Sequence, residues 1–386
     1  MAPALRIVLA AALAAQLGGC STLNALNPFS SSAPRVKPAP LTNFQPSVGI
    51  KTQWQVSTGK SDEFTLTPAV VGDSVYAASK SGMLARYDNG REVWRTNVGQ
   101  IISGGVGADK QVVAVGTPKG EVLAFDSADG KPKWQARASS EVLAAPAVGQ
   151  GLVIVRSGDS RVFAFEQADG KRKWVYQRTV PALSVRTNAG VLLSGPGILA
   201  GFPGGRLVAI ATANGAALWE FSVAQPKGAT ELERVADITS TPVLDVRNAC
   251  AVAFQGRATC LDISNGSSLW SREVSSTAGL DIDSRAVYVS DDNGSVLAFD
   301  RFTGASLWKQ TALAHRGLSR PIALGSYIVV GDAEGYIHAL RRDDGALAAR
   351  ISTDGSPIAA DPQATENGFV IQTRNGSIYS LTLEKQ

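Results

Sequence analysis

The sequence predicts an all-β fold, an eight-bladed β-propeller made of four-stranded antiparallel blades. Three observations lead to this prediction: a repeated phrase, the short strands around it, and two incomplete copies at the ends. The phrase is clearest at 124–134, where a small residue is followed six positions later by glycine and ten positions later by tryptophan. Successive tryptophans lie about 40 residues apart, the length expected of a propeller blade.

The phrase occurs in seven internal copies. Five keep the full spacing: Ala124/Gly130/Trp134, Ala164/Gly170/Trp174, Ala209/Gly215/Trp219, Cys260/Gly266/Trp270 and Ala298/Gly304/Trp308. Two are shorter or degraded: Ala85/Gly90/Trp94 and Ala339/Gly345/Ala349. Because position 349 lacks the tryptophan, we expect the loosest contact between neighbouring blades there.

Each copy predicts two hairpins. In one of them, 294–300 forms a short apolar strand, a turn follows in which Gly304 can adopt positive φ, and 306–308 returns as the next strand. Upstream, 286–294 predicts a second hairpin, because its loop is rich in Asp, Asn and Gly. Each copy therefore supplies about four strands, with no helical periodicity between them.

The two ends predict how the ring closes. The last copy, 376–383, stops before its glycine turn and tryptophan strand, whereas 52–56 is a tryptophan strand with no preceding turn. If the N-terminal strand pairs with the C-terminal strands, the two halves complete an eighth blade and hide two open edges. A seven-bladed ring is the alternative if a degraded copy forms no blade.

The tryptophans have two interpretations. They pack between blades, or they stack ligands; their shared place in the repeat favours packing. The repeat resembles that of quinoprotein-like propellers, over residues 50–383. This resemblance implies the fold and says little about activity, because one fold hosts many functions.

The N-terminus predicts export and lipid attachment. Residues 1–19 read as a signal peptide with Arg6 before a short apolar core, and 17–20 resemble a bacterial lipobox ending at Cys20. An ordinary cleaved signal with a chance cysteine is the alternative. We expect residues 1–19 to be removed, Cys20 to carry the lipid, 20–47 to be a flexible Ser/Pro-rich tether, and 48–386 to form the propeller.

Charge and cysteine content exclude some classes of protein. The formal charge of +4 is spread along the chain without a basic run, which disfavours nucleic-acid binding. Cys250 and Cys260 fall in one predicted hairpin. They form a disulfide, which an exported protein permits, or Cys260 is only a small filler where most copies have alanine.

The residues offer little chemistry. The two histidines are His315, in a loop without a partner motif, and His338, in a strand position that is apolar in other copies. No zinc, metalloprotease or serine-hydrolase motif is present. We therefore predict no catalytic residue, metal or cofactor, and no enzyme activity. A quinone-dependent dehydrogenase is the enzymatic alternative.

Two segments break the repeat, 180–186 and 228–242. Together with 314–316 and 330–338, they resemble the BamB family, lipoproteins of the outer-membrane β-barrel assembly machinery. The resemblance covers signal, lipobox, tether and blades. It implies docking on the POTRA domains of BamA, with other Bam lipoproteins and nascent outer-membrane proteins as further partners. Carried over by position, the contacts are Leu183, Val185, Arg186 and Asp237; the family's second Asp is here Thr239.

The predicted function is therefore that of a non-catalytic scaffold, lipid-anchored to the outer membrane on its periplasmic face, that assists folding and insertion of β-barrel proteins. An exposed Leu/Val pair beside an arginine suits a small interface core with a charged rim. The alternative is that these side chains belong to an ordinary strand. A generic envelope-binding propeller is the remaining functional alternative.

Overall fold

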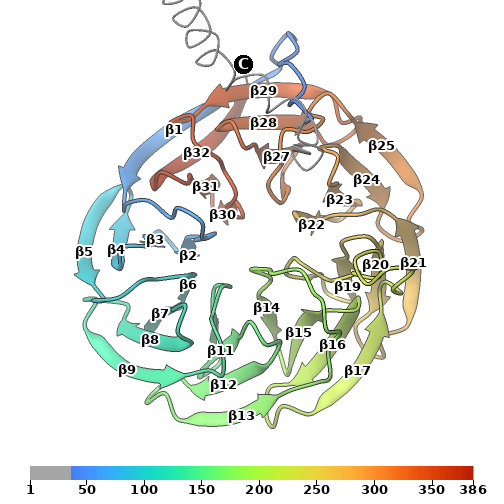
Figure 1. Ribbon diagram of the computed structural model, residues 1–386. Coiled ribbons are helices and arrows are strands. Elements are labelled where there is room, and N and C mark those ends of the chain that lie inside the picture. The colour runs from blue at the N-terminus through green and yellow to red at the C-terminus, as the bar shows by residue number, and fades with distance from the viewer. Residues whose placement is uncertain (1–35, 386) are drawn as a thin grey trace, which may run out of the picture. The chain divides into compact units, whose positions relative to one another are not determined.

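The computed structural model describes residues 36–385, which form strands and no helix. No helix within this range is long and apolar enough to cross a membrane. The strands make eight four-stranded antiparallel sheets arranged in a ring (Figure 1). Inner-strand residues of several blades, among them Ala69, Val191 and Gln363, line a central cavity, here called the channel. The predicted eight-bladed propeller is confirmed.

Seven blades are continuous in sequence, with their strands in chain order from the channel to the rim. Blades one and two contain β2 (Ala69–Val71), β3 (Ser74–Ala78), β4 (Met83–Asp88), β5 (Arg91–Asn97), β6 (Gly104–Ala108), β7 (Val112–Gly116), β8 (Glu121–Asp126) and β9 (Pro132–Arg137). Blades three and four contain β10 (Ala147–Gly149), β11 (Leu152–Arg156), β12 (Val162–Glu166), β13 (Arg172–Tyr176), β14 (Val191–Ser194), β15 (Gly197–Phe202), β16 (Arg206–Ala211) and β17 (Ala217–Ser222).

Blades five to seven follow the same plan. They contain β18 (Val243–Leu244), β19 (Asn248–Val252), β20 (Arg257–Asp262), β21 (Ser268–Glu273), β22 (Gly279–Ile282), β23 (Ala286–Ser290), β24 (Val296–Asp300), β25 (Ser306–Gln310), β26 (Ile322–Leu324), β27 (Tyr327–Gly331), β28 (Tyr336–Arg341) and β29 (Leu347–Ser352). Their middle strands are almost wholly buried because both faces of each sheet pack on a neighbouring blade.

Blade eight joins the two ends of the chain, as predicted. Strands β30 (Gln363–Thr365), β31 (Gly368–Gln372) and β32 (Ser377–Lys385) are completed by β1 (Val48–Ser57) at the rim. Trp54 lies opposite Ser380 in this pairing, and a bulge between Thr52 and Trp54 shifts the register. The ring is thus closed by backbone hydrogen bonds between strands more than 300 positions apart.

The tryptophans join neighbouring blades. Trp134 lies opposite Ala124 in its own blade, and its ring covers Gly170 of the next blade, where an added Cβ would lie 2.5 Å from the ring. Its indole N–H donates to the Gln167 carbonyl at 2.8 Å. The other five internal pairs are Trp94–Ser127, Trp174–Thr212, Trp219–Ile263, Trp270–Arg301 and Trp308–Arg342. This arrangement agrees with the packing interpretation.

Blade seven, which lacks the tryptophan, is covered in another way. Residues 38–47, here called the N-terminal arm, run along it before β1 begins. The Ala39 N–H donates to the Ala314 carbonyl at 2.8 Å, and the Ser47 N–H to the Ala348 carbonyl at 2.9 Å. Ala349 is only 3% exposed and lies in one hydrophobic cluster with Val48 at the start of β1. The expected loose seam is closed, and the part of the expected tether from about Pro38 onwards packs on the propeller instead.

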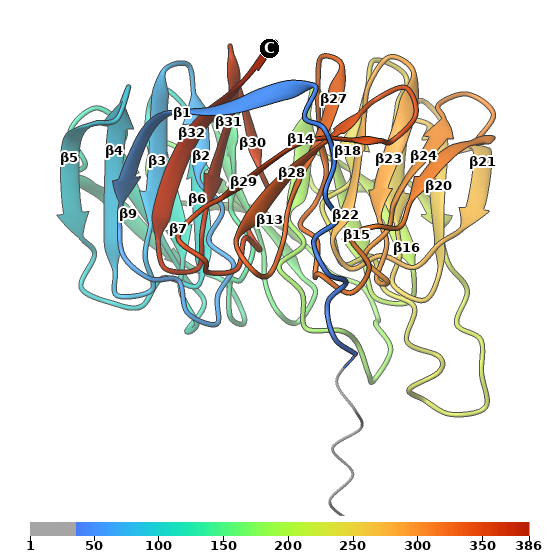
Figure 2. The same ribbon diagram turned by 90° about the horizontal axis from the view of Figure 1, so that it is seen from above.

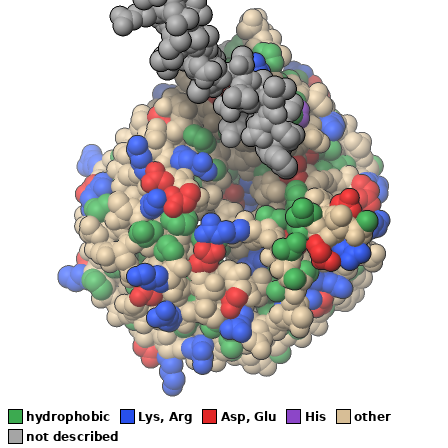
Figure 3. Space-filling model, in the orientation of Figure 1, with side chains coloured by type: hydrophobic (Ala, Val, Ile, Leu, Met, Phe, Trp, Pro, Cys, Tyr) green, Lys and Arg blue, Asp and Glu red, His purple; other side chains and the backbone are tan. Residues whose placement is uncertain are grey.

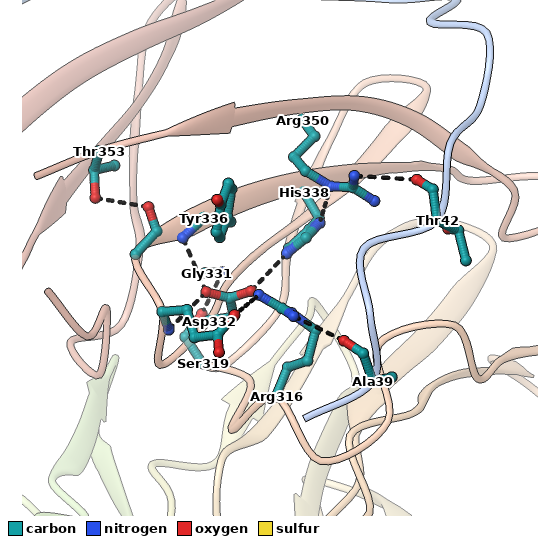
Figure 4. Close-up of polar contacts among 12 residues, drawn as sticks. Ala39, Thr42, Arg316, Ser319, Gly331, Asp332, Tyr336, His338, Arg350 and Thr353 are labelled. Carbon is teal, nitrogen blue, oxygen red and sulfur yellow. Dashed lines mark hydrogen bonds and ion pairs between the residues drawn. The ribbon is translucent and has the colours of Figure 1, made fainter. Parts of the chain in front are cut away.

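A buried polar cluster holds the arm (Figure 4). Arg316 donates to Asp332 Oδ2 at 2.7 Å and to the Ala39 carbonyl at 2.9 Å. Arg350 donates to the Thr42 carbonyl at 3.1 Å and to His338 Nδ1 at 3.3 Å, while His338 Nε2 lies 2.9 Å from Asp332 Oδ2. These contacts assign His338 the neutral form with its proton on Nε2.

The connections between blades all lie on one side of the disc, here called the loop face. This follows from the topology, because every blade starts at the same face and its four strands alternate in direction. Figure 2 shows the connections extending from this side, with the N-terminal arm starting on it as well. The opposite side, here called the turn face, carries tight turns within blades, together with the start of β1 and the end of β32.

Candidate protein-docking site

The two longest connections of the loop face are the segments that broke the sequence repeat. One links β13 to β14 across 177–190, and the other links β17 to β18 across 223–242. The other connections between blades are shorter, whereas these two are long enough to present side chains to solvent. They place the predicted contact residues on adjacent blades.

The first connection carries three of the four predicted contacts. Leu183 is 45% exposed, Val185 is half-buried and Arg186 is exposed. They do not belong to a strand, because β14 begins only at Val191. The alternative that they form one face of an ordinary strand is therefore wrong.

Asp237, the fourth predicted contact, is placed differently from the expectation. It is 2% exposed, and its carboxylate accepts hydrogen bonds from the backbone N–H groups of Val185 at 2.6 Å and Gly204 at 2.9 Å. In this structure Asp237 therefore faces the chain's own backbone and not solvent. It fixes Val185 in place and so positions the neighbouring Leu183 and Arg186.

Thr239 has a similar internal role. It is 4% exposed, and its backbone carbonyl accepts a hydrogen bond from the Thr187 hydroxyl at 2.6 Å. The end of the second connection thus holds the first connection at two points. Substituting Thr for the family's second Asp changes a buried position and not the exposed surface.

An ion pair that the sequence did not indicate lies beside these residues. Arg186 donates two hydrogen bonds to Glu141, at 2.7 and 3.0 Å. The hydrogen bond with Arg186 lowers the pKa of the Glu141 carboxyl and raises the pKa of the guanidinium. The pair links the connection before blade three to the connection after it, so Arg186 is preorganised while its side chain stays 60% exposed.

The outer part of the second connection projects from the disc, as Figure 2 shows for the yellow-green segment. Leu232 is 73% exposed there. The segment is organised by its own side chains: Glu233 accepts hydrogen bonds from the backbone of Ala229 at 2.7 Å and Thr230 at 3.0 Å. On the loop face in Figure 3, hydrophobic side chains gather beside the central opening among interspersed charges.

A cavity of about 140 Å³ lies beneath the first connection. Arg156, Ser157 and Ser160 line it from blade three, and 184–187 line it from above. Burial lowers the pKa of Arg156 to about 10, although the nearby Asp237 opposes the shift. Neither Arg156 nor Glu141 stands in a recognisable motif, so the sequence alone does not indicate either residue.

The remaining predicted positions lie away from this surface. Cys250 and Cys260 lie directly opposite each other in β19 and β20 and are joined by a disulfide in the structure. His338 is fully buried in the cluster around the N-terminal arm. Cys20 and the predicted signal peptide lie outside the described residues. Within 36–385, no group of His, Cys, Asp and Glu side chains is arranged to hold a metal ion.

Comparisons with known proteins agree with this architecture. Residues 80–310 match the family described as outer membrane protein assembly factor BamB. The chain is 44% identical to the Bordetella pertussis protein of that name over 365 residues, 94% of each chain. It is 36% identical to the Escherichia coli protein of that name over 381 residues, 95% of this chain and 96% of the relative.

Among solved structures, one similarity extends to both sequence and fold, and another extends to the fold alone. The crystal structure of BamB from Moraxella catarrhalis superposes with a TM-score of 0.81 at 30% identity, covering 86% of this chain and all of that one. Quinohemoprotein alcohol dehydrogenase from Comamonas testosteroni gives a TM-score of 0.71 at only 13% identity, a likeness of fold alone. The chain belongs to the BamB family of outer membrane protein assembly factors.

Proposed function

We propose that the chain is a non-catalytic scaffold of the outer-membrane assembly machinery, which docks on the POTRA domains of BamA through its loop face. In this role it assists folding and insertion of β-barrel precursors. Family membership supports the general role. The choice of partner domains and of contact residues is our proposal.

One observation carries this proposal furthest: the apolar Leu183 and Val185 stand beside a preorganised Arg186 on a rigid disc. Leu183 is exposed on a connection that Asp237 pins by accepting a hydrogen bond from the Val185 backbone N–H. An interface core of this kind loses little conformational entropy on binding, because the loop is already ordered. We assign Leu183, Val185 and Arg186 to direct contact and Asp237 to positioning.

Attachment to the membrane completes the proposal. A lipid on Cys20 would anchor the chain to the outer membrane from the periplasmic side. The N-terminal arm reaches the propeller beside Ala314, on the same face as the docking connections. Tethering raises the local concentration of the propeller at the membrane, so a modest interface suffices for occupancy.

A mild-detergent co-purification of the tagged chain tests the partner. Wild type is expected to bring BamA with it, together with other lipoproteins of the machinery. Leu183→Glu places a charge in the interface core, and Arg186→Ala removes the rim cation, so both are expected to reduce BamA recovery. Val246→Glu is the matched control, because Val246 is 92% exposed in the turn between β18 and β19 on the turn face.

The outcomes separate the candidate functions. Normal recovery of BamA by both loop-face variants would remove these residues from the docking site. If wild type recovers no BamA, a generic envelope-binding role would replace the proposal. Turnover of an alcohol by the purified chain with added quinone cofactor would instead support the enzymatic alternative.

A further inference from the structure

Arg156 stands in a position that is small or aliphatic in every other continuous blade. In every continuous blade, one residue of the second strand lies opposite the small residue of the repeat. The residue two positions after it is Arg156 in blade three, and in the other blades it is Ser79, Gly116, Gly201, Val252, Ser290 or Gly331. An arginine at this slot of blade three is therefore an exception to the repeat.

The small residues leave room for an apolar side chain from the following connection. A Cβ added to Gly116 would lie 2.3 Å from Val142 Cγ1, and one added to Gly201 would lie 2.2 Å from Ile238 Cγ2. In blade seven, Ile358 fills the same space over Gly331. These side chains plug the loop-face end of their blades.

Blade three has no such plug. Its connection, 177–190, passes over the slot with Ser184 and the half-buried Val185, and the cavity of about 140 Å³ remains beneath them. Its lining combines serine and threonine hydroxyl groups and the Arg156 guanidinium with the Glu141 carboxylate, which is paired with Arg186, and with apolar side chains such as Leu143. Where blades two, four and seven have an apolar plug of their own, blade three has a pocket with a cation in its wall.

The guanidinium is poorly satisfied. Arg156 is only 7% exposed, and its one hydrogen bond to the described part of the chain, to the Ala189 carbonyl, is 3.5 Å long. Asp237 supplies a nearby negative charge, but its oxygens are engaged by backbone N–H groups. A buried cation with most of its five N–H donors unmet is costly, and a carboxylate is the group that satisfies it best.

We propose that this pocket receives the carboxylate side chain of an Asp or Glu from the docked partner, which forms an ion pair with Arg156. The inference rests on the proposed docking function and deepens it, since the contact residues Val185 and Arg186 are themselves part of the pocket lining. The volume accommodates a carboxylate with a short alkyl stem. The partner thus supplies the plug that blade three lacks.

The test measures binding of the full chain to the purified POTRA region of BamA. Arg156→Met removes the cation but keeps an apolar stem, and we expect affinity to fall about 30-fold or more, as for loss of one member of a buried charge pair. Arg285→Met removes an exposed cation from the turn face and is the matched control. Circular dichroism and the unfolding midpoint establish that each variant is folded.

A double-mutant cycle distinguishes a direct contact from a structural effect. Each exposed Asp or Glu of the POTRA region is changed to its amide and titrated against wild type and Arg156→Met. At least one amide substitution is expected to weaken binding about tenfold in wild type and to have no effect with Arg156→Met. A merely structural role of Arg156 would leave every acidic position uncoupled.

A second variant tests the pocket without removing the cation. Ser160→Asp places a carboxylate on the pocket wall, at a left-handed residue where Asp is tolerated. It is expected to weaken POTRA binding at least tenfold. Wild-type affinity in either Arg156→Met or Ser160→Asp would overturn the inference, while loss of binding by Leu183→Glu alone would leave the docking proposal standing. If wild type does not bind the POTRA region, both proposals fail.

Discussion

Replacing Arg316 with methionine tests how firmly the N-terminal arm is held. The guanidinium is 2% exposed and donates to Asp332, to the Ala39 carbonyl and to Glu334. Methionine keeps the apolar stem and removes all three interactions. The variant therefore leaves the fully buried Asp332 carboxylate with fewer donors and releases the start of the arm.

The magnitude follows from the partners that remain. Removing one member of a buried ion pair costs about 3–5 kcal/mol, because the other charge stays buried. Asp332 still accepts hydrogen bonds from His338 and from the backbone N–H groups of Glu334 and Tyr336, each at 2.9 Å. We therefore expect the lower end of that range, about 3 kcal/mol of lost unfolding free energy.

Urea denaturation followed by tryptophan fluorescence measures the loss. Limited proteolysis gives a second readout, because the arm of Arg316→Met is expected to be cleaved within 38–47 much faster than that of wild type. Arg257→Met is the control: Arg257 is paired with Glu273 at 2.7 Å but exposed, and such pairs contribute little. If Arg316→Met loses no more stability than this control and the arm is cleaved at the wild-type rate, Arg316 and the buried polar cluster around it do not hold the arm.

Three further predictions concern the propeller. Gly170→Ala is expected to lose about 1–3 kcal/mol more unfolding free energy than Gly151→Ala. Both glycines have φ near +75°, but only Gly170 lies against a tryptophan ring, so only there does the added methyl group overpack. Urea midpoints measure the difference. Burial lowers the pKa of His338 in the folded chain, so as the pH falls the imidazole is protonated in the unfolded chain before it is protonated in the folded chain. Protonation of the unfolded chain costs stability, so wild type should lose more unfolding free energy than His338→Leu between pH 7.5 and 5.0. Replacing both Cys250 and Cys260 with alanine should cost about 2–3 kcal/mol, estimated from a closed loop of about 10 residues, and denatured, unreduced wild type should show no thiol labelling at either position.

The architecture could be predicted because its determinants are local and repeated. In five blades a small residue lies opposite the blade's own tryptophan, and in all seven continuous blades a glycine lies against the tryptophan of the blade before it. Both features recur in the sequence at a regular spacing. Ring closure was also legible, since 52–56 carries the strand that 376–383 lacks. The missing tryptophan at 349 was equally visible, but its replacement by the arm was not. Arg316 and Arg350 hold the arm through backbone carbonyls, which every residue has, so the sequence contains no pattern that indicates these contacts.

The site could be predicted only in part, because residue type alone does not determine whether a side chain is exposed or buried. Leu183 and Arg186 are exposed, as a contact role requires, whereas Asp237 reads as an acidic contact until its carboxylate is found on two backbone N–H groups. Arg156 had a usable signal, a charge in a slot that is otherwise small or aliphatic, but it emerges only when the strand registers are aligned.

The loop face as the docking surface is tested most directly by photocrosslinking in cells. A photoreactive residue at position 183 is expected to crosslink to a POTRA domain of BamA, while the same residue at position 246 on the turn face is not. Crosslinks to BamA from position 246 and none from position 183 would contradict the account.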